Sequence, residues 1–135
     1  MSNQPITVER IEELLAFVPG FDDPNREYIE RWTGGETADG ALVWPHPVYA
    51  PDVLAFFNLA GQPCWSDYGY KPAEAADMLA DDDLIRSADL DQIKTMLTCC
   101  VRGERFCDGY WGAVLREGRV VLLLKRLAEL RDQMA

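Results

Sequence analysis

Residues 89–109 read DLDQIKTMLTCCVRGERFCDG, and they contain the clearest helix signal in the chain. Asp89 with Gln92 three positions later forms a capping-box pattern, which marks the start of a helix. Apolar residues then recur at steps of three and four, which is typical of a helix that packs against a core. This stripe consists of Leu90, Ile93, Met96, Leu97, Cys100 and Val101. The sequence therefore predicts a helix that begins at Leu90 and has one apolar face, and we call it the 90–101 helix.

Further helices are predicted on the N-terminal side of this segment. Each begins with a capping residue or with proline at the first helical position, and most end at glycine. The starts are Thr7, Pro24, Pro51, Pro72 and Asp81, with ends at Pro19-Gly20, Gly34-Gly35, Gly61 and about Ala80. The helix after Pro24 would present Tyr28, Ile29 and Trp32 on one face. The helix after Pro51 is so apolar that we expect it to be deeply buried.

Two segments between these helices lack helical periodicity. Residues 36–49 contain Pro45-His46-Pro47, which excludes a helix there, so we expect a long loop with one edge strand at 41–44. Residues 62–70 hold Trp65, Tyr68 and Tyr70 among proline, glycine and polar residues. That composition indicates an aromatic-lined loop.

The C-terminal part allows two interpretations. Residues 110–117 and 119–133 form helices joined at Gly118, or residues 111–115 and 120–124 form the strands of a hairpin. We favour helices because one apolar face continues through the polar residues. That face consists of Val120, Leu123, Leu124, Leu127, Leu130 and Met134. The predicted fold is therefore mainly α: a compact single domain over residues 1–135, with about six or seven helices, long aromatic-rich loops and one short β element.

The composition is that of a globular protein. The chain has 135 residues, of which 48 % are hydrophobic and 27 % charged, and this suits one domain with a sizeable core. The longest apolar run, from Val120 to Leu124, is far shorter than the roughly 20 residues that a membrane span needs. Residues 1–7 lack the features of a secretory signal. We therefore expect a cytoplasmic protein with no membrane partner.

The net charge is −10, and the acidic residues are concentrated in the first two-thirds of the chain. Residues 1–89 hold 17 acids and 5 bases, a net −12, whereas residues 90–135 hold 6 acids and 8 bases, a net +2. Phosphate backbones are bound through clustered Lys and Arg, so general nucleic-acid binding is not expected. A basic protein partner or a small ligand fits better, although acids of this kind also simply solvate helix surfaces.

The cysteines and the histidine do not indicate a metal site. No C-x-x-C pair occurs, and the single histidine, His46, lies between two prolines. The four cysteines are Cys64, Cys99, Cys100 and Cys107. We expect reduced and largely buried thiols, no metal and no cofactor; the glycine-rich motifs of nucleotide-binding loops are also absent from the sequence.

The segment at the end of the 90–101 helix carries the candidate ligand site. Glu104 follows Cys100 by four residues, which places a carboxylate beside the core-facing side of the helix. On an adjacent face Thr98, Arg102 and Arg105 would line one groove, and arginine forks match the oxygens of a small anion. The candidate ligand-binding residues are Thr98, Arg102, Glu104, Arg105 and Asp108, with Trp65 and Tyr68 of the aromatic loop closing over them.

Two alternatives use the same residues differently. In the structural alternative, Glu104 pairs with Arg105, Arg126 or another base from a neighbouring helix. In the catalytic alternative, Glu104 or Asp108 acts as general acid or base while an arginine stabilises developing negative charge. Cys107 would act as a nucleophile only beside an orienting histidine, and the sequence places none near it.

The pattern Arg102-Gly103-Glu104-Arg105-Phe106, followed by Asp108-Gly109, resembles an uncharacterised bacterial domain-of-unknown-function family of about this length. That family has an R-x-E-R-F-x-x-G segment and a leucine-rich final helix with an R-L pair, which is Arg126-Leu127 here. The likeness is specific over residues 95–128 and loose over the N-terminal half. It implies a single, mainly helical domain and supplies no activity.

Two functions from different classes fit these observations. The first is a non-enzymatic binding or regulatory module whose acidic helical surface docks a basic partner protein, and its binding should weaken with salt. The second is a small anionic-ligand binding protein or an enzyme, with its site around Arg102, Glu104, Arg105 and Asp108. The sequence favours the first over an enzyme and leaves the oligomeric state open.

Overall fold

The computed structural model describes residues 5–36, 40 and 42–134. Its α-helices are α1 (Val8–Leu15), α2 (Val18–Phe21), α3 (Pro51–Ala60), α4 (Pro72–Leu79), α5 (Asp82–Arg86), α6 (Leu90–Gly103), α7 (Tyr110–Arg116) and α8 (Arg119–Met134), and a 3-10 helix spans Pro63–Trp65. A two-stranded antiparallel hairpin, β1 (Ile29–Glu36) and β2 (Leu42–Tyr49), lies between α2 and α3. The predicted mainly α fold with a short β element is confirmed.

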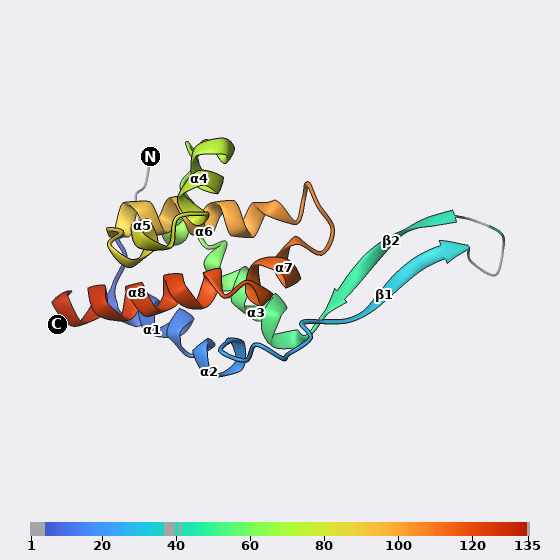
Figure 1. Cartoon of the computed structure of the whole chain (residues 1–135), viewed down its shortest axis with the longest axis horizontal. Helices are drawn as coiled ribbons and strands as arrows, with labels where there is room; N and C mark the ends of the chain where they lie inside the picture. The colour runs from blue at the N-terminus through green and yellow to red at the C-terminus, as the bar shows by residue number, and fades with distance from the viewer. Residues whose placement is uncertain (1–4, 37–39, 41, 135) are drawn as a thin grey trace.

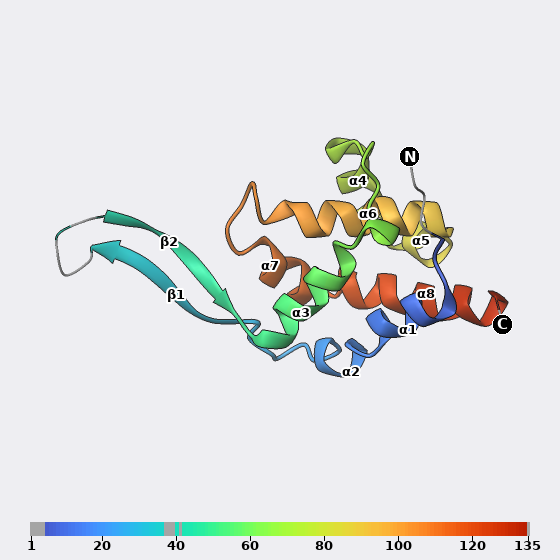
Figure 2. The ribbon, with the colours of Figure 1, turned by 180° about the vertical axis from the view of Figure 1, so that it is seen from behind.

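The molecule consists of a body of helices and an arm, the hairpin of β1 and β2, which projects from one end of the body (Figure 1). Helix α5 and the C-terminal end of α8 lie at the opposite end, as the view from behind also shows (Figure 2). Among the described helices, none is both long and apolar enough to cross a lipid bilayer.

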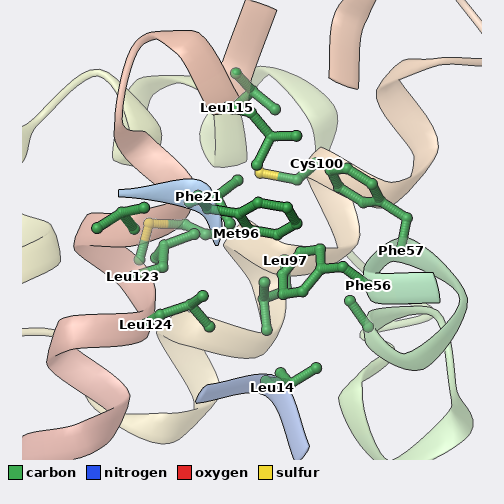
Figure 3. Packing of buried hydrophobic residues seen from close by; sticks show 14 of the residues in the cluster. Leu14, Phe21, Phe56, Phe57, Met96, Leu97, Cys100, Leu115, Leu123 and Leu124 are labelled. Atoms are coloured by element: carbon green, nitrogen blue, oxygen red, sulfur yellow. The ribbon is translucent and has the colours of Figure 1, made fainter. Parts of the chain in front are cut away.

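The core forms around α6 and α8, and α6 confirms the predicted 90–101 helix with its apolar face. The apolar stripe of α6 buries Ile93, Met96 and Leu97, and α8 buries Leu123 and Leu124 against it. The shorter helices cover these two and fill the space between them. Figure 3 shows where their side chains meet: Leu14, Phe21, Phe56, Phe57, Met96, Leu97, Cys100, Leu115, Leu123 and Leu124.

The helix starts agree with the capping signals. Thr7 caps α1, Asp81 caps α5, and Asp89 and Gln92 form the expected capping box at α6. Residues 110–134 form two helices joined at Gly118, which has a φ of +79°, so the favoured helical interpretation is confirmed over a hairpin there.

Two details of the predicted helices are wrong. Pro19 and Gly20 do not end the first helical region, because they lie within the short α2, where proline occupies an early position that needs no N–H partner. Helix α3 is not buried all round: it packs with one side on the core, and Leu54 on its other side is 50 % exposed.

The helix predicted between Pro24 and Gly34-Gly35 is also wrong, because residues 29–36 form β1. The spacing of Tyr28, Ile29 and Trp32 fits a helix face, but aromatic and β-branched residues also favour extended backbone. Pairing decides in favour of the strand: Trp32 lies opposite Pro47 in β2. Tyr28 precedes the strand as a fully buried residue, and its hydroxyl donates to the carbonyl of Phe21 at 3.0 Å.

The edge strand expected at 41–44 is longer than predicted. It runs from Leu42 to Tyr49, through Pro45 and Pro47, while residue 41 lies outside the described residues. Prolines occur in a strand where its outer edge has no neighbour, because no ladder bond is then lost there. The two prolines that exclude a helix are thus compatible with a two-stranded arm.

An ion pair fixes the connection between α2 and the arm. The guanidinium of Arg26 donates to both carboxylate oxygens of Asp52, in the first turn of α3, at 2.8 and 2.6 Å. It also donates to the carbonyl of Gly20 at 2.8 Å and lies 4.9 Å from the ring centre of Tyr28. The hydrogen bond from Arg26 lowers the pKa of the Asp52 carboxyl. The pair therefore stabilises the folded chain wherever Asp52 is ionised.

We expect Asp52→Asn to lower the free energy of unfolding by about 1–2 kcal/mol at neutral pH, because the pair is bidentate but partly exposed. The folded-state pKa lies below the unfolded value of about 3.9, so this contribution is complete above that value and is lost as pH falls through the folded pKa. Urea unfolding of wild type and variant over this pH range measures the difference.

The matched control is Asp83→Asn in the exposed Arg86–Asp83 pair, whose side chains are 60 % and 96 % exposed. It should change the free energy of unfolding by less than about 0.5 kcal/mol. A difference between wild type and Asp52→Asn that stays constant down to strongly acidic pH would contradict this account of the pair.

Candidate functional site

Glu104, directly after α6, is the residue on which the site is built. Its Oε2 accepts a hydrogen bond from the N–H of Gly109 at 2.9 Å, and its Oε1 accepts from the N–H of Trp111 at 3.0 Å. The hydroxyl of Tyr49, the last residue of β2, donates to the same Oε1 at 2.7 Å. We call Tyr49, Glu104, Gly109 and Trp111 the Glu104 cluster. One carboxylate therefore contacts the arm and caps the start of α7.

Tyr49 connects the arm to α7 in two ways. Its hydroxyl accepts from the N–H of Gly112 at 3.4 Å while it donates to Glu104. Burial, together with the hydrogen bond to Glu104, raises the pKa of the Tyr49 phenol. The phenol therefore stays protonated at neutral pH and keeps its donor. A neighbouring residue, Ile29 of β1, packs so closely on Gly112 that an added Cβ there would lie 3.1 Å from it.

Trp111, in the first turn of α7, connects this helix to the end of α6. Its indole N–H donates to the carbonyls of Cys100 and Val101 at 3.0 and 3.1 Å, which belong to the last turn of α6. These carbonyls have no partner within the helix, so the indole satisfies them. The Trp111 ring stacks on Phe57 of α3, with ring centres 4.4 Å apart and planes at 7°.

The structural alternative predicted the wrong partners for Glu104. Neither Arg105 nor Arg126 pairs with this carboxylate among the described residues; Arg126 instead donates to Glu129 and to the carbonyl of Ala88. The structural alternative named only basic side chains as partners of this carboxylate. Backbone N–H groups at a helix start serve equally well, because they are unpaired donors that attract negative charge.

The other candidate residues do not come together in one site. Arg105 lines one surface pocket together with Glu104, whereas the guanidinium of Arg102 lies 5.2 Å from the ring centre of Tyr70. Asp108 is exposed in the loop between α6 and α7. Thr98 and Trp65 are buried, at 3 % and 1 % exposure, whereas Tyr68 is 70 % exposed. Arg102 and Arg105 thus belong to different surroundings.

Thr98 and its neighbour Thr95 attach the aromatic loop to α6. The Thr98 hydroxyl accepts from the backbone N–H of Asp67 at 2.8 Å and donates to the carbonyl of Lys94 at 2.8 Å. Thr95 donates to the carboxylate of Asp67 at 2.7 Å. Trp65 is thereby held in the core, which is the packing role that aromatic residues in loops commonly have.

A pocket of about 510 Å³ opens beside the Glu104 cluster. It is lined by Leu54, Phe57, Asn58, Val101, Glu104, Arg105 and Trp111. Aromatic and aliphatic side chains form most of this lining, and Arg105 supplies a positive charge. No ion pair to Arg105 occurs within the part of the chain that the structure describes. The pocket can therefore receive an apolar group that carries an acidic substituent.

The cysteines behave as expected of free thiols. Cys64 and Cys100 are buried, and burial raises the pKa of both. Cys107 is exposed in the loop after α6. The described residues contain no group of three or more His, Cys, Asp or Glu side chains that is placed to hold a metal ion.

Sequence reasoning missed Tyr49, Phe57 and Trp111 as parts of this site. Tyr49 and Glu104 are separated by 55 positions, so no local pattern connects them. A local signal did exist for the capping role of Glu104. Asp108-Gly109 is a turn signal directly before the helix predicted at 110–117, and a carboxylate five residues before that glycine is within reach of the first N–H groups of that helix.

We expect Glu104→Ala to lower the free energy of unfolding by about 2–4 kcal/mol, because three donors lose their acceptor. Tyr49→Phe should cost about 1 kcal/mol, and the double variant should cost less than the sum because the two groups share one bond. Urea unfolding of the wild type, the two single variants and the double variant measures this coupling.

Asp108→Ala, which removes a nearby exposed carboxylate, is the control and should change the free energy of unfolding by less than about 0.5 kcal/mol. Additive effects of Glu104→Ala and Tyr49→Phe would contradict the contact.

The comparisons with known proteins identify a family. No curated protein and no solved structure matches the chain. A family model with the description "Family of unknown function (DUF6508)" matches residues 6–133. The match includes the N-terminal half, where the resemblance in the sequence is loose, as well as the segment that carries the Glu104 cluster. The chain belongs to the DUF6508 family.

Proposed function

We propose that this protein is a non-enzymatic binding module whose acidic helical surface docks a basic partner protein. The observation that supports it is an acidic groove of about 360 Å³ between α4 and the start of α6. Four carboxylates and one cation line this groove: Asp67, Glu74, Asp89, Asp91 and Lys71. The groove has the charge that a Lys or Arg side chain from a partner requires.

Two of these carboxylates are available to a partner. Asp67 accepts from Thr95, and Asp89 caps α6, so both are engaged within the fold. Glu74 and Asp91 form no ion pair within the described residues. Met78, which is half-buried, lies in the same groove and offers an apolar surface to the stem of a long basic side chain.

The Glu104 cluster supports a binding module over an enzyme. A general acid or base must exchange a proton with a substrate within hydrogen-bond reach. The oxygens of Glu104 accept from Tyr49, Gly109 and Trp111 within the fold, and these bonds hold the arm and α7 in place. This carboxylate therefore has a structural task that accounts for its hydrogen bonds to the described residues.

We expect a fluorescent lysine-rich peptide to bind the protein and its affinity to fall steeply as salt is raised, since charge attraction is screened. The double variant Glu74→Gln/Asp91→Asn should weaken binding about tenfold, whereas Glu9→Gln/Glu12→Gln, which makes the same change in net charge on α1, should weaken it far less. Fluorescence anisotropy measures both. Equal losses in the two variants, or no binding at low salt, would contradict docking at this groove.

The pocket beside Arg105 favours a second candidate function, binding of a small anionic ligand. Its aromatic lining and the guanidinium of Arg105, which forms no ion pair with a described residue, fit a planar carboxylate. We expect naphthoate, used in excess, to raise the melting temperature by a few degrees, because it binds only the folded chain. Arg105→Ala should remove this shift and Arg102→Ala should retain it. A shift that survives in Arg105→Ala, or none in the wild type, excludes this site.

A further inference from the structure

Glu104 and Arg105 are adjacent residues of opposite charge that both line the pocket beside the Glu104 cluster. Among the described lining residues, Glu104 carries the only carboxylate and Arg105 the only cation. Neighbours in sequence do pair elsewhere in this chain, since the guanidinium of Arg131 lies 3.3 Å from the carboxylate of Asp132. No ion pair joins Glu104 to Arg105 within the residues that the structure describes. Their closeness in sequence is therefore not enough to bring these two charges together.

Three hydrogen bonds direct the Glu104 carboxylate toward the start of α7 and the arm. The backbone N–H groups of Gly109 and Trp111 donate to Oε2 and Oε1 at 2.9 and 3.0 Å. The hydroxyl of Tyr49 donates to Oε1 at 2.7 Å, the shortest of the three distances. Of these three bonds, it is the one whose donor is a side chain. Tyr49→Phe therefore removes this bond and leaves both backbone donors in place.

The surroundings of Tyr49 direct its proton to Glu104. The side chain is buried, and its hydroxyl oxygen accepts from the N–H of Gly112 at 3.4 Å. Its ring lies against that of Trp111, with ring centres 5.4 Å apart. A hydroxyl that accepts from one group still has its proton to donate to another, and Glu104 is the acceptor here. The phenol is thus a fixed donor to this carboxylate.

Release of the Glu104 carboxylate would place a competitor at Arg105. A carboxylate and a guanidinium form charge-assisted hydrogen bonds when they meet. An anionic ligand would then have to displace Glu104 in order to bind the same guanidinium. A neutral ligand of the same shape does not depend on that charge. Loss of the Tyr49 hydrogen bond should therefore weaken the binding of anionic ligands selectively.

We propose that Tyr49 is a positioning residue that determines the charge preference of this pocket. Its hydroxyl keeps the carboxylate of Glu104 at the start of α7, so that the guanidinium of Arg105 is available to an aromatic carboxylate. The inference rests on the second candidate function, binding of a small anionic ligand in this pocket. None of the described lining residues belongs to the arm. Through Tyr49, the arm thus acts on a pocket that it does not line.

Isothermal titration calorimetry at constant salt, with naphthoate and its neutral counterpart naphthamide, tests the proposal. The wild type should bind naphthoate about tenfold more tightly than naphthamide, because a charge-assisted pair with Arg105 adds to the apolar contacts. In Tyr49→Phe this preference should fall to about threefold or less, because the affinity for naphthoate falls while that for naphthamide is unchanged.

Tyr28→Phe is the matched control. It removes the hydroxyl of another buried tyrosine, which donates to the carbonyl of Phe21 at 3.0 Å, and Tyr28 is not among the lining residues. Both affinities should be unchanged in this variant. Equal losses of affinity for the two ligands in Tyr49→Phe would mean that its hydroxyl only holds the fold together. That result would overturn the inference and leave the second candidate function intact, whereas a wild type that binds neither ligand would overturn both.

Glu104→Gln provides a second test, because an amide has no charge with which to neutralise Arg105. In the Glu104→Gln background, Tyr49→Phe should leave the preference for naphthoate unchanged. A loss of preference that is equally large in both backgrounds would overturn the inference. Circular dichroism verifies that each variant is folded. If Glu104→Gln does not fold, the comparison of the two ligands in wild type and Tyr49→Phe decides by itself.

Discussion

The carboxylate of Glu104 connects the two parts of the molecule. Helix α7 has glycine at its N-cap position, so it has no side chain of its own to satisfy its first N–H groups. Glu104 supplies the acceptor from the preceding loop, and the indole of Trp111 in turn supplies a donor to the last carbonyls of α6. A residue next to α6 thus satisfies N–H groups at the start of α7, and a residue of α7 satisfies carbonyls at the end of α6. Tyr49 then attaches the arm to the connection between α6 and α7 through its hydrogen bond to Glu104.

The helices were predictable from the sequence because their signals are local. A capping residue, a proline at the first turn and an apolar stripe act within a few residues, and α1, α3, α4, α5 and α6 follow them. The arm was not predictable in the same way. Apolar and β-branched residues at 28–33 fit either a helix face or a strand, and the choice depends on pairing with residues 46–49 of β2, at least 13 positions further along the chain. Local patterns do not contain that information.

The candidate site shows the same division between local and distant information. The place of Glu104 beside the apolar side of α6 predicted that its carboxylate needs a partner. The sequence did not indicate that Tyr49 and the N–H groups at the start of α7 are its partners. Thr98 and Arg102 illustrate a second limit. A shared helix face predicts that two side chains are neighbours, yet Thr98 is buried against the aromatic loop while Arg102 lies over Tyr70. Whether Thr98, Arg102 and Arg105 line one groove depends on which of them the aromatic loop covers, and that loop buries Thr98.

The separation of Tyr49 and Glu104 by 55 positions also bears on how the chain folds. The contacts among α6, α7 and α8 are close in sequence and need only short loops to close, whereas the contact between Tyr49 and Glu104 requires a long segment to be ordered first. We therefore expect the contacts among α6, α7 and α8 to form before the arm docks. Interactions made after the transition state govern the rate of unfolding more than the rate of folding. If the arm docks after the transition state, the hydroxyl of Tyr49 acts mainly on the lifetime of the native state.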